Sequence, residues 1–138
     1  MPTVWTVEPE ERVMWNGYRL LVVEDDLELC ESIAEVLRLT GYEVETALDA
    51  ETALAMLRGA PAPDAIVLDL VLPTMSASEL VAALDRAPAL VLMSGLAQPR
   101  ASAFPPGDVL LKPFGAEQLL SRVARACGHL GGEDAAAP

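Results

Sequence analysis

The stretch Ile66-Val67-Leu68-Asp69-Leu70-Val71-Leu72 places a single carboxylate inside a run of apolar residues. The residues before the carboxylate do not alternate between polar and apolar, which is typical of a strand that helices cover on both faces. A charge in such surroundings costs free energy unless a cation or a hydrogen-bond donor meets it. Asp69 is therefore the first candidate functional residue, and it stands where a buried strand ends.

The apolar run Ala65–Leu68 is one of four such runs in the chain. The others are Leu20–Val23, Ala89–Met93 and Val109–Leu111, and each is rich in valine, isoleucine or leucine. Glu43–Ala47 alternates instead, with a valine between two glutamates, as expected of an edge strand with one wetter face. The sequence thus predicts five strands.

Helical periodicity fills the gaps after the first two predicted strands. Asp26–Leu39 carries an apolar stripe, and Gly41 stands where it can end that helix. The stripe consists of Leu27, Cys30, Ile33, Ala34 and Leu37. Ala50–Arg58 repeats the pattern through Ala53, Leu54 and Leu57, and Gly59 follows it.

Two more helices are predicted later in the chain. Ser76 and Glu79 have the spacing of a capping box, which opens a helix to about Arg86. The last helix, about Ala116 to Cys127, buries Leu119, Leu120 and Val123 and stops near Gly128. The segment from 95 to 111 holds three prolines, so it keeps at most one or two helical turns, over about Pro99–Ala103.

Strands that alternate with helices predict an α/β fold with a mostly parallel sheet and right-handed crossovers. Sheets of this kind bind ligands in the crevice at the carboxyl ends of their strands. The residues that follow each predicted strand are therefore the ones to compare.

Composition limits the possible functions. The 138 residues fit one domain, and the 52% of hydrophobic residues can bury a sizeable core. A net charge of −12 disfavours direct binding to nucleic acid or to an anionic membrane surface. No apolar run approaches the ~20 residues of a membrane-spanning helix, and the first residues do not resemble an export signal. We expect a cytoplasmic protein in which Cys30 and Cys127 are reduced and buried.

Carboxylates, a hydroxyl and an ammonium group follow the predicted strands. They belong to Glu24-Asp25-Asp26, Asp69, Ser94-Gly95 and Lys112-Pro113-Phe114, and Lys112 is the only lysine of the chain. Each has an ordinary explanation as well: Asp26 suits a helix N-cap, Ser94 a turn, and Lys112 a solvated cation. Their joint placement at successive strand ends is the stronger signal.

This set has the composition of a Mg²⁺-dependent phosphoryl-transfer site. Mg²⁺ prefers a few carboxylates together with waters and phosphate oxygens. Asp25 and Asp69 would be direct ligands, and Glu24 would act directly or through a water. Lys112 and Ser94 would contact the oxygens of the transferring group. Asp69 itself would be the nucleophile and would form a mixed anhydride.

From about Arg19 to Gly128 the chain resembles response-regulator receiver domains. The resemblance rests on four motifs in order: Leu21-Val22-Val23-Glu24-Asp25-Asp26, Asp64 to Asp69 with Leu72-Pro73, Met93-Ser94-Gly95, and Leu111-Lys112-Pro113-Phe114. It implies a flavodoxin-like sheet of five parallel strands in the order 2-1-3-4-5. It also implies that Asp69 takes phosphate, with Mg²⁺, from a histidine kinase or a phosphotransfer protein. The backbone carbonyl of Val71 would then be a further metal ligand.

The resemblance also divides the chain and suggests a partner surface. Residues 19–128 would form the receiver domain, residues 129–138 a flexible tail, and residues 1–18 a linker. His129, the first residue of the tail, would be a surface residue. Because residues 1–18 contain Trp5 and Trp15, they could also bind a partner. The kinase or phosphotransfer domain would dock over the strand ends, against the first helix, and the oligomeric state stays open.

Three features depart from the family pattern. Ser76-Ala77 replaces a common Asp-Gly pair, Val109 stands where many members have an aromatic switch residue, and the proline-rich segment replaces most of the fourth helix. That segment and the sequence around Lys112 are most similar to receivers of hybrid histidine kinases. The apolar Val71 and Leu96, beside the expected path of the hydrolytic water, predict slow self-dephosphorylation.

Other interpretations stay open. The chain could be a receiver-like scaffold that is never phosphorylated, which Val109 and the eroded fourth helix favour. It could be a haloacid-dehalogenase-like phosphohydrolase, but such an enzyme needs an acid where this chain has Val71, and it needs a cap domain. Flavin binding is the weakest interpretation, because no phosphate-binding loop follows the first predicted strand. On the favoured interpretation the protein is not an enzyme, since it changes only its own phosphorylation.

Overall fold

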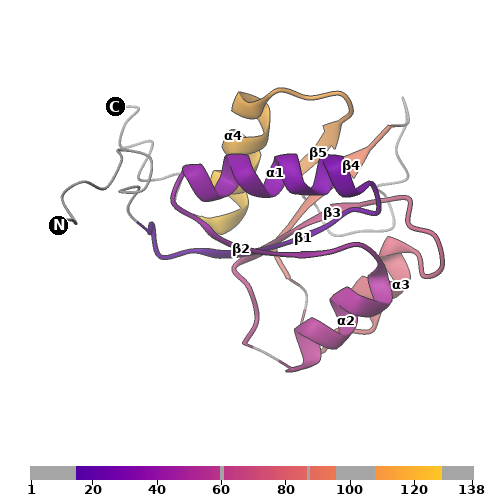
Figure 1. Ribbon diagram of the computed structural model, residues 1–138. Helices are drawn as coiled ribbons and strands as arrows, with labels where there is room; N and C mark the ends of the chain where they lie inside the picture. Colours follow the sequence, from indigo (N-terminus) through magenta and orange to yellow (C-terminus); the bar gives the residue numbers. More distant parts are fainter. Residues whose placement is uncertain (1–14, 60, 87, 96–107, 129–138) are drawn as a thin grey trace, which may run out of the picture.

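The computed structural model describes residues 15–59, 61–86, 88–95 and 108–128. Within them a parallel sheet has the strand order β2-β1-β3-β4-β5, which confirms the expected topology (Figure 1). The elements are β1 (Arg19–Val23), α1 (Leu27–Leu39), β2 (Glu43–Ala47), α2 (Ala50–Gly59), β3 (Ala65–Asp69), α3 (Ala77–Ala82), β4 (Leu90–Ser94), β5 (Asp108–Leu111) and α4 (Ala116–Cys127).

Helices cover both faces of this sheet. Figure 1 shows α1 and α4 on one face and α2 and α3 on the other. Neighbouring residues of one strand serve the two layers: Val67 packs in the α1–α4 layer, and Ile66 and Leu68 pack in the α2–α3 layer. Because both faces are covered, the central strands need apolar residues at every position, which explains why their sequences do not alternate.

β3 and β4 extend one residue further toward their carboxyl ends than the apolar runs predicted. β3 includes Asp69, which pairs with Met93, and β4 includes Ser94, which pairs with Leu111. Backbone hydrogen bonds continue past these positions: the Leu70 N–H donates to the Met93 carbonyl at 2.9 Å. The ladder uses backbone groups, so it carries the polar side chains to the edge of the sheet at fixed positions.

The helix predictions were correct in type and wrong in some details. Leu27 was placed on the buried stripe of α1, but its side chain is 53% exposed. It is the first residue of the helix, and only the later turns, with Cys30, Ile33 and Leu37, are buried. The helix predicted to reach about Arg86 ends at Ala82, although its capping box is present as expected.

The sequence predicts that both cysteines are reduced and buried. Cys30 and Cys127 are free thiols, but only Cys30 is fully buried. The turns predicted over Pro99–Ala103, and Leu96 and His129, lie outside the described residues. Among the helices of the described ranges, none is long and apolar enough to cross a membrane.

Candidate functional site

Asp69 ends β3 as a buried carboxylate, with 5% of the residue exposed. Its Oδ1 accepts a hydrogen bond from the Val71 N–H at 3.0 Å, and its Oδ2 accepts one from Lys112 Nζ at 3.1 Å. The donor and the cation that a buried charge requires are both present. The carboxylate is therefore held in one orientation at the edge of the sheet.

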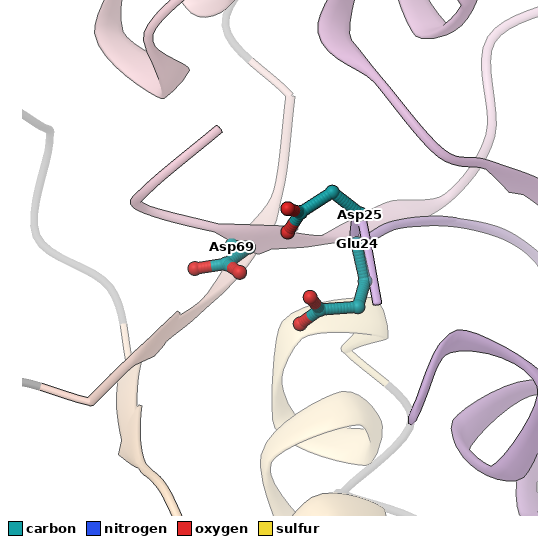
Figure 2. Close-up of side chains that lie close together, drawn as sticks. All are labelled: Glu24, Asp25 and Asp69. Atoms are coloured by element: carbon teal, nitrogen blue, oxygen red, sulfur yellow. The ribbon is translucent and has the colours of Figure 1, made fainter. Parts of the chain in front are cut away.

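Two further carboxylates reach Asp69 from the end of β1. Glu24 is only 1% exposed, whereas Asp25 is exposed. Figure 2 shows both side chains turning toward Asp69. One carboxylate oxygen from each of the three residues lies within 4.8 Å of the others. The strand ends thus bring together the three acidic residues that the sequence singled out as metal ligands.

Asp26, the third acidic residue after β1, has a different role. Its Oδ1 accepts a hydrogen bond from the Leu29 N–H at 3.2 Å, and its backbone is extended, so it caps the amino end of α1. Its own N–H donates to Glu24 Oε2 at 3.0 Å. The helix cap therefore also helps to hold Glu24 in place. This contact could not be predicted from the sequence.

Lys112 connects the two buried carboxylates. Besides its contact with Asp69, its Nζ donates to Glu24 Oε1 at 2.8 Å. Burial would by itself lower the pKa of Lys112, but the hydrogen bonds to Glu24 and Asp69 outweigh it and raise that pKa. Burial raises the pKa of Glu24, while the Lys112 hydrogen bond acts against this effect. Lys112 thus remains charged beside the cluster.

Ser94 and Val71 lie at the ends of β4 and β3. Ser94 is fully buried, and its carbonyl accepts a hydrogen bond from the Lys112 N–H at 2.8 Å, which ties the ends of β4 and β5 together. Val71 is 62% exposed, next to the carboxylate that its N–H contacts. The peptide bond after Lys112, to Pro113, is cis.

The donor set fits a hard divalent cation. Three carboxylates supply oxygen ligands, which Mg²⁺ prefers, and one ammonium balances only part of their charge. Both oxygens of Glu24 already accept hydrogen bonds from the protein, whereas Asp25 is exposed. Asp25 is therefore better placed for direct coordination than Glu24, whereas Asp69 is engaged like Glu24, since both of its oxygens accept hydrogen bonds.

Residues 20–124 match the family model described as the response regulator receiver domain. Response regulator MprA of Mycobacterium tuberculosis is 38% identical over 125 residues, which cover 86% of this chain and 54% of that protein. Response regulator MprA of Mycolicibacterium vanbaalenii is 38% identical over 112 residues, or 76% of this chain and 48% of that protein. The chain thus spans about half the length of the curated relatives it matches.

Solved structures show the same likeness. The chemotaxis response regulator CheY4 of Vibrio cholerae superposes with a TM-score of 0.71 at 29% identity, covering 79% of this chain and 98% of that one. Response regulator protein TrrA of Thermotoga maritima, solved in complex with Mg²⁺-BeF, gives a TM-score of 0.69 at 25% identity, with 79% and 98% covered. These matches bear out the flavodoxin-like fold expected from the motifs.

Proposed function

The chain belongs to the response regulator receiver family, and we propose that Asp69 is its phosphoacceptor, supplied by a histidine kinase or a phosphotransfer protein. One observation supports this most: a buried aspartate at a strand end contacts a lysine and lies beside two more carboxylates. A purely structural aspartate would not need this acidic surrounding, which costs electrostatic repulsion.

In the proposed reaction, a carboxylate oxygen of Asp69 attacks the phosphorus of the donor. The bond from phosphorus to the donor atom breaks, and the donor leaves with that electron pair. The nitrogen of a phosphohistidine then takes up a proton to become neutral imidazole. Lys112, already 3.1 Å from Asp69 Oδ2, would move its contact to the oxygens of the phosphoryl group. The Ser94 hydroxyl would donate a hydrogen bond to the same group.

A bound Mg²⁺ would supply positive charge to the transferring group. Asp25, Asp69 and the backbone carbonyl of Val71 would hold it, with Glu24 acting through a water. TrrA, a solved relative, was crystallised with Mg²⁺-BeF, which supports a metal of this kind here. The protein's part is to fix these ligands at the ends of β1 and β3.

The protein donor would dock against α1. A groove of about 390 Å³ lies beside the site, lined by Leu29, Lys112, Pro113 and Phe114. Leu27 adds an exposed apolar side chain at the start of the same helix. We expect Leu27→Arg to slow transfer from a phosphorylated phosphotransfer domain by about tenfold, because a charge replaces apolar contact area.

Transfer from acetyl phosphate separates docking from chemistry, because this small donor reaches the site without a protein surface that could dock on α1. Leu27→Arg should leave its rate within about twofold of the wild type, since the site itself is unchanged. Equal slowing with both donors would show that the substitution damages the site, and would remove α1 from the proposed docking surface.

The phosphoacceptor itself is tested by intact mass. The wild type, incubated with acetyl phosphate and Mg²⁺, should gain one phosphoryl mass, and Asp69→Asn should gain none, since an amide is a poor nucleophile. A wild type without added mass would favour the unphosphorylated scaffold. Turnover of a phosphomonoester would favour the phosphohydrolase, although Val71 offers no general acid two residues after Asp69.

On this proposal the chain is not an enzyme with an external product. It catalyses only its own phosphorylation and dephosphorylation. The strongly negative chain is also not expected to bind nucleic acid or an anionic membrane by itself.

A further inference from the structure

A second concave surface adjoins the acidic cluster. It is a groove of about 700 Å³ lined by Asp25, Leu48, Asp49, Glu51, Thr52, Pro73 and Thr74. These residues follow β1, β2 and β3 in the sequence, so the groove opens at the same edge of the sheet as Asp69. The groove of about 390 Å³ beside α1 shares none of its lining residues. Asp25 belongs both to this second groove and to the acidic cluster.

The second groove combines negative charge with exposed apolar surface. Three of its seven lining residues are carboxylates, and none of the seven is basic. Leu48 is 41% exposed, and Pro73, which also lines the groove, is exposed too. A binding segment that matches this surface needs at least one basic and one apolar side chain.

Hydrogen bonds fix the walls of the groove. Asp49 Oδ1 accepts from the Thr52 N–H at 2.7 Å, at the start of α2. The Thr74 hydroxyl donates to Glu51 Oε2, and this bond joins the loop after β3 to α2. A groove with walls that are already ordered pays less conformational entropy when a partner binds.

We propose that this groove docks a segment of a partner protein that carries both basic and apolar side chains. Charge complementarity selects this occupant: a basic segment meets Asp25, Asp49 and Glu51 while its apolar side chain covers Leu48. A second copy of the chain, with its net charge of −12, is a poorer match. The proposal does not depend on whether Asp69 is phosphorylated.

The test uses the full chain and a short synthetic peptide of alternating lysine and leucine, in the presence of a chelator so that Asp25 holds no metal. Amide shifts in the nuclear magnetic resonance spectrum should move first at Leu48–Thr52 and Thr74. The double variant Asp49→Asn, Glu51→Gln should weaken binding by about tenfold at low ionic strength, because two charge pairs are lost. Asparagine and glutamine keep the hydrogen bonds to Thr52 and Thr74.

The matched control removes two charges elsewhere. Glu31→Gln with Glu35→Gln changes two exposed glutamates of α1, and it should weaken binding less than about twofold. Equal weakening by both double variants would mean that the peptide only senses the overall charge, and would overturn the proposal. So would undiminished binding of a peptide with serine in place of leucine. Groove amides that shift with protein concentration alone would assign the groove to a second copy instead.

Discussion

At the residue scale, Lys112 balances the charge of the site. Its Nζ meets Glu24 at 2.8 Å and Asp69 at 3.1 Å, and both partner side chains are almost fully buried. Lys112→Met keeps most of the apolar stem but leaves two buried carboxylates without their cation. We expect the free energy of unfolding without Mg²⁺ to fall by about 2 kcal/mol, less than the roughly 3–5 kcal/mol of a fully buried pair, because Lys112 is partly exposed.

Urea unfolding at neutral pH measures this loss. Arg58→Met is the matched control, since Arg58 is an exposed cation at the end of α2. It should change the free energy of unfolding by less than about 0.5 kcal/mol. Equal losses of unfolding free energy in both variants would show that the ion pairs of Lys112 contribute no more stability than an exposed cation does.

The stability should also depend on pH. Because the fold raises the pKa of Lys112, the protonated lysine stabilises the fold below its ordinary pKa of 10.5, and this contribution is lost as the pH rises above that value.

Val71 bears on how long a phosphoryl group would persist. It is 62% exposed beside Asp69, and an apolar side chain cannot orient a hydrolytic water by hydrogen bonding. We therefore expect slow self-dephosphorylation, and several-fold faster loss of label from Val71→Asn, measured after the donor is removed.

Leu39→Asn, an equally polar change at the exposed end of α1, should leave the decay rate of the label unchanged. Faster decay in the wild type than in Val71→Asn would contradict the idea. The second position named in the sequence, Leu96, lies outside the described residues.

At the element scale, we expect the capping box of α3 to contribute measurably to the free energy of unfolding. The helix has six residues, and Ser76 closes both bonds of the box: its hydroxyl accepts from the Glu79 N–H at 3.1 Å, and its N–H donates to Glu79 Oε1 at 2.9 Å. Ser76→Ala should lower the free energy of unfolding by about 1 kcal/mol. Ser32→Ala, at an exposed position inside α1, should cost nothing measurable, since alanine favours helices.

Urea unfolding of the two variants decides this prediction. The reason for the loss is that α3 is too short to be stable by itself and depends on its cap and on the burial of Ala77 and Leu80. A Ser76→Ala variant as stable as Ser32→Ala would mean that packing alone holds α3 in place.

The elements also show what the sequence could and could not predict. Continuous apolar runs predicted the buried strands because both faces of the sheet are covered, and four motifs in order predicted the strand order through their likeness to a family. The ends of the helices were predicted less accurately. Leu27 fits the periodicity of α1 but lies before its buried turns, and α3 ends at Ala82. Periodicity describes a face and not the length over which a neighbour covers it.

The sequence predicted which residues of the candidate site lie close together, but not the hydrogen bonds that join them. That the strands end together placed Glu24, Asp25, Asp69 and Lys112 at one edge before any geometry was known. The sequence could not show that Lys112 bridges Glu24 and Asp69, nor that the Asp26 N–H holds Glu24. Such contacts depend on side-chain directions and on distances that strand spacing alone does not set.

At the scale of the whole molecule, charge and architecture act together. Three carboxylates converge at one end of the sheet in a chain of net charge −12, so any cation is attracted to this protein to some degree. A specific metal site must therefore be distinguished from general attraction. Removing single carboxylates at the cluster and away from it makes that distinction.

We expect Mg²⁺ to raise the melting temperature of the protein, since a ligand that binds only the folded state stabilises it by about 2.7 kcal/mol at a concentration of 100 times its Kd. Asp25→Asn should abolish most of this gain and cost the metal-free fold little, because Asp25 is exposed and its loss relieves repulsion. Asp85→Asn, an exposed aspartate after α3, should keep the full gain. Thermal unfolding in Mg²⁺, and in NaCl of equal ionic strength, measures both. If NaCl gives the same increase, or if the two variants respond alike, the cations act only by screening the negative chain, and the strand ends do not form a metal site.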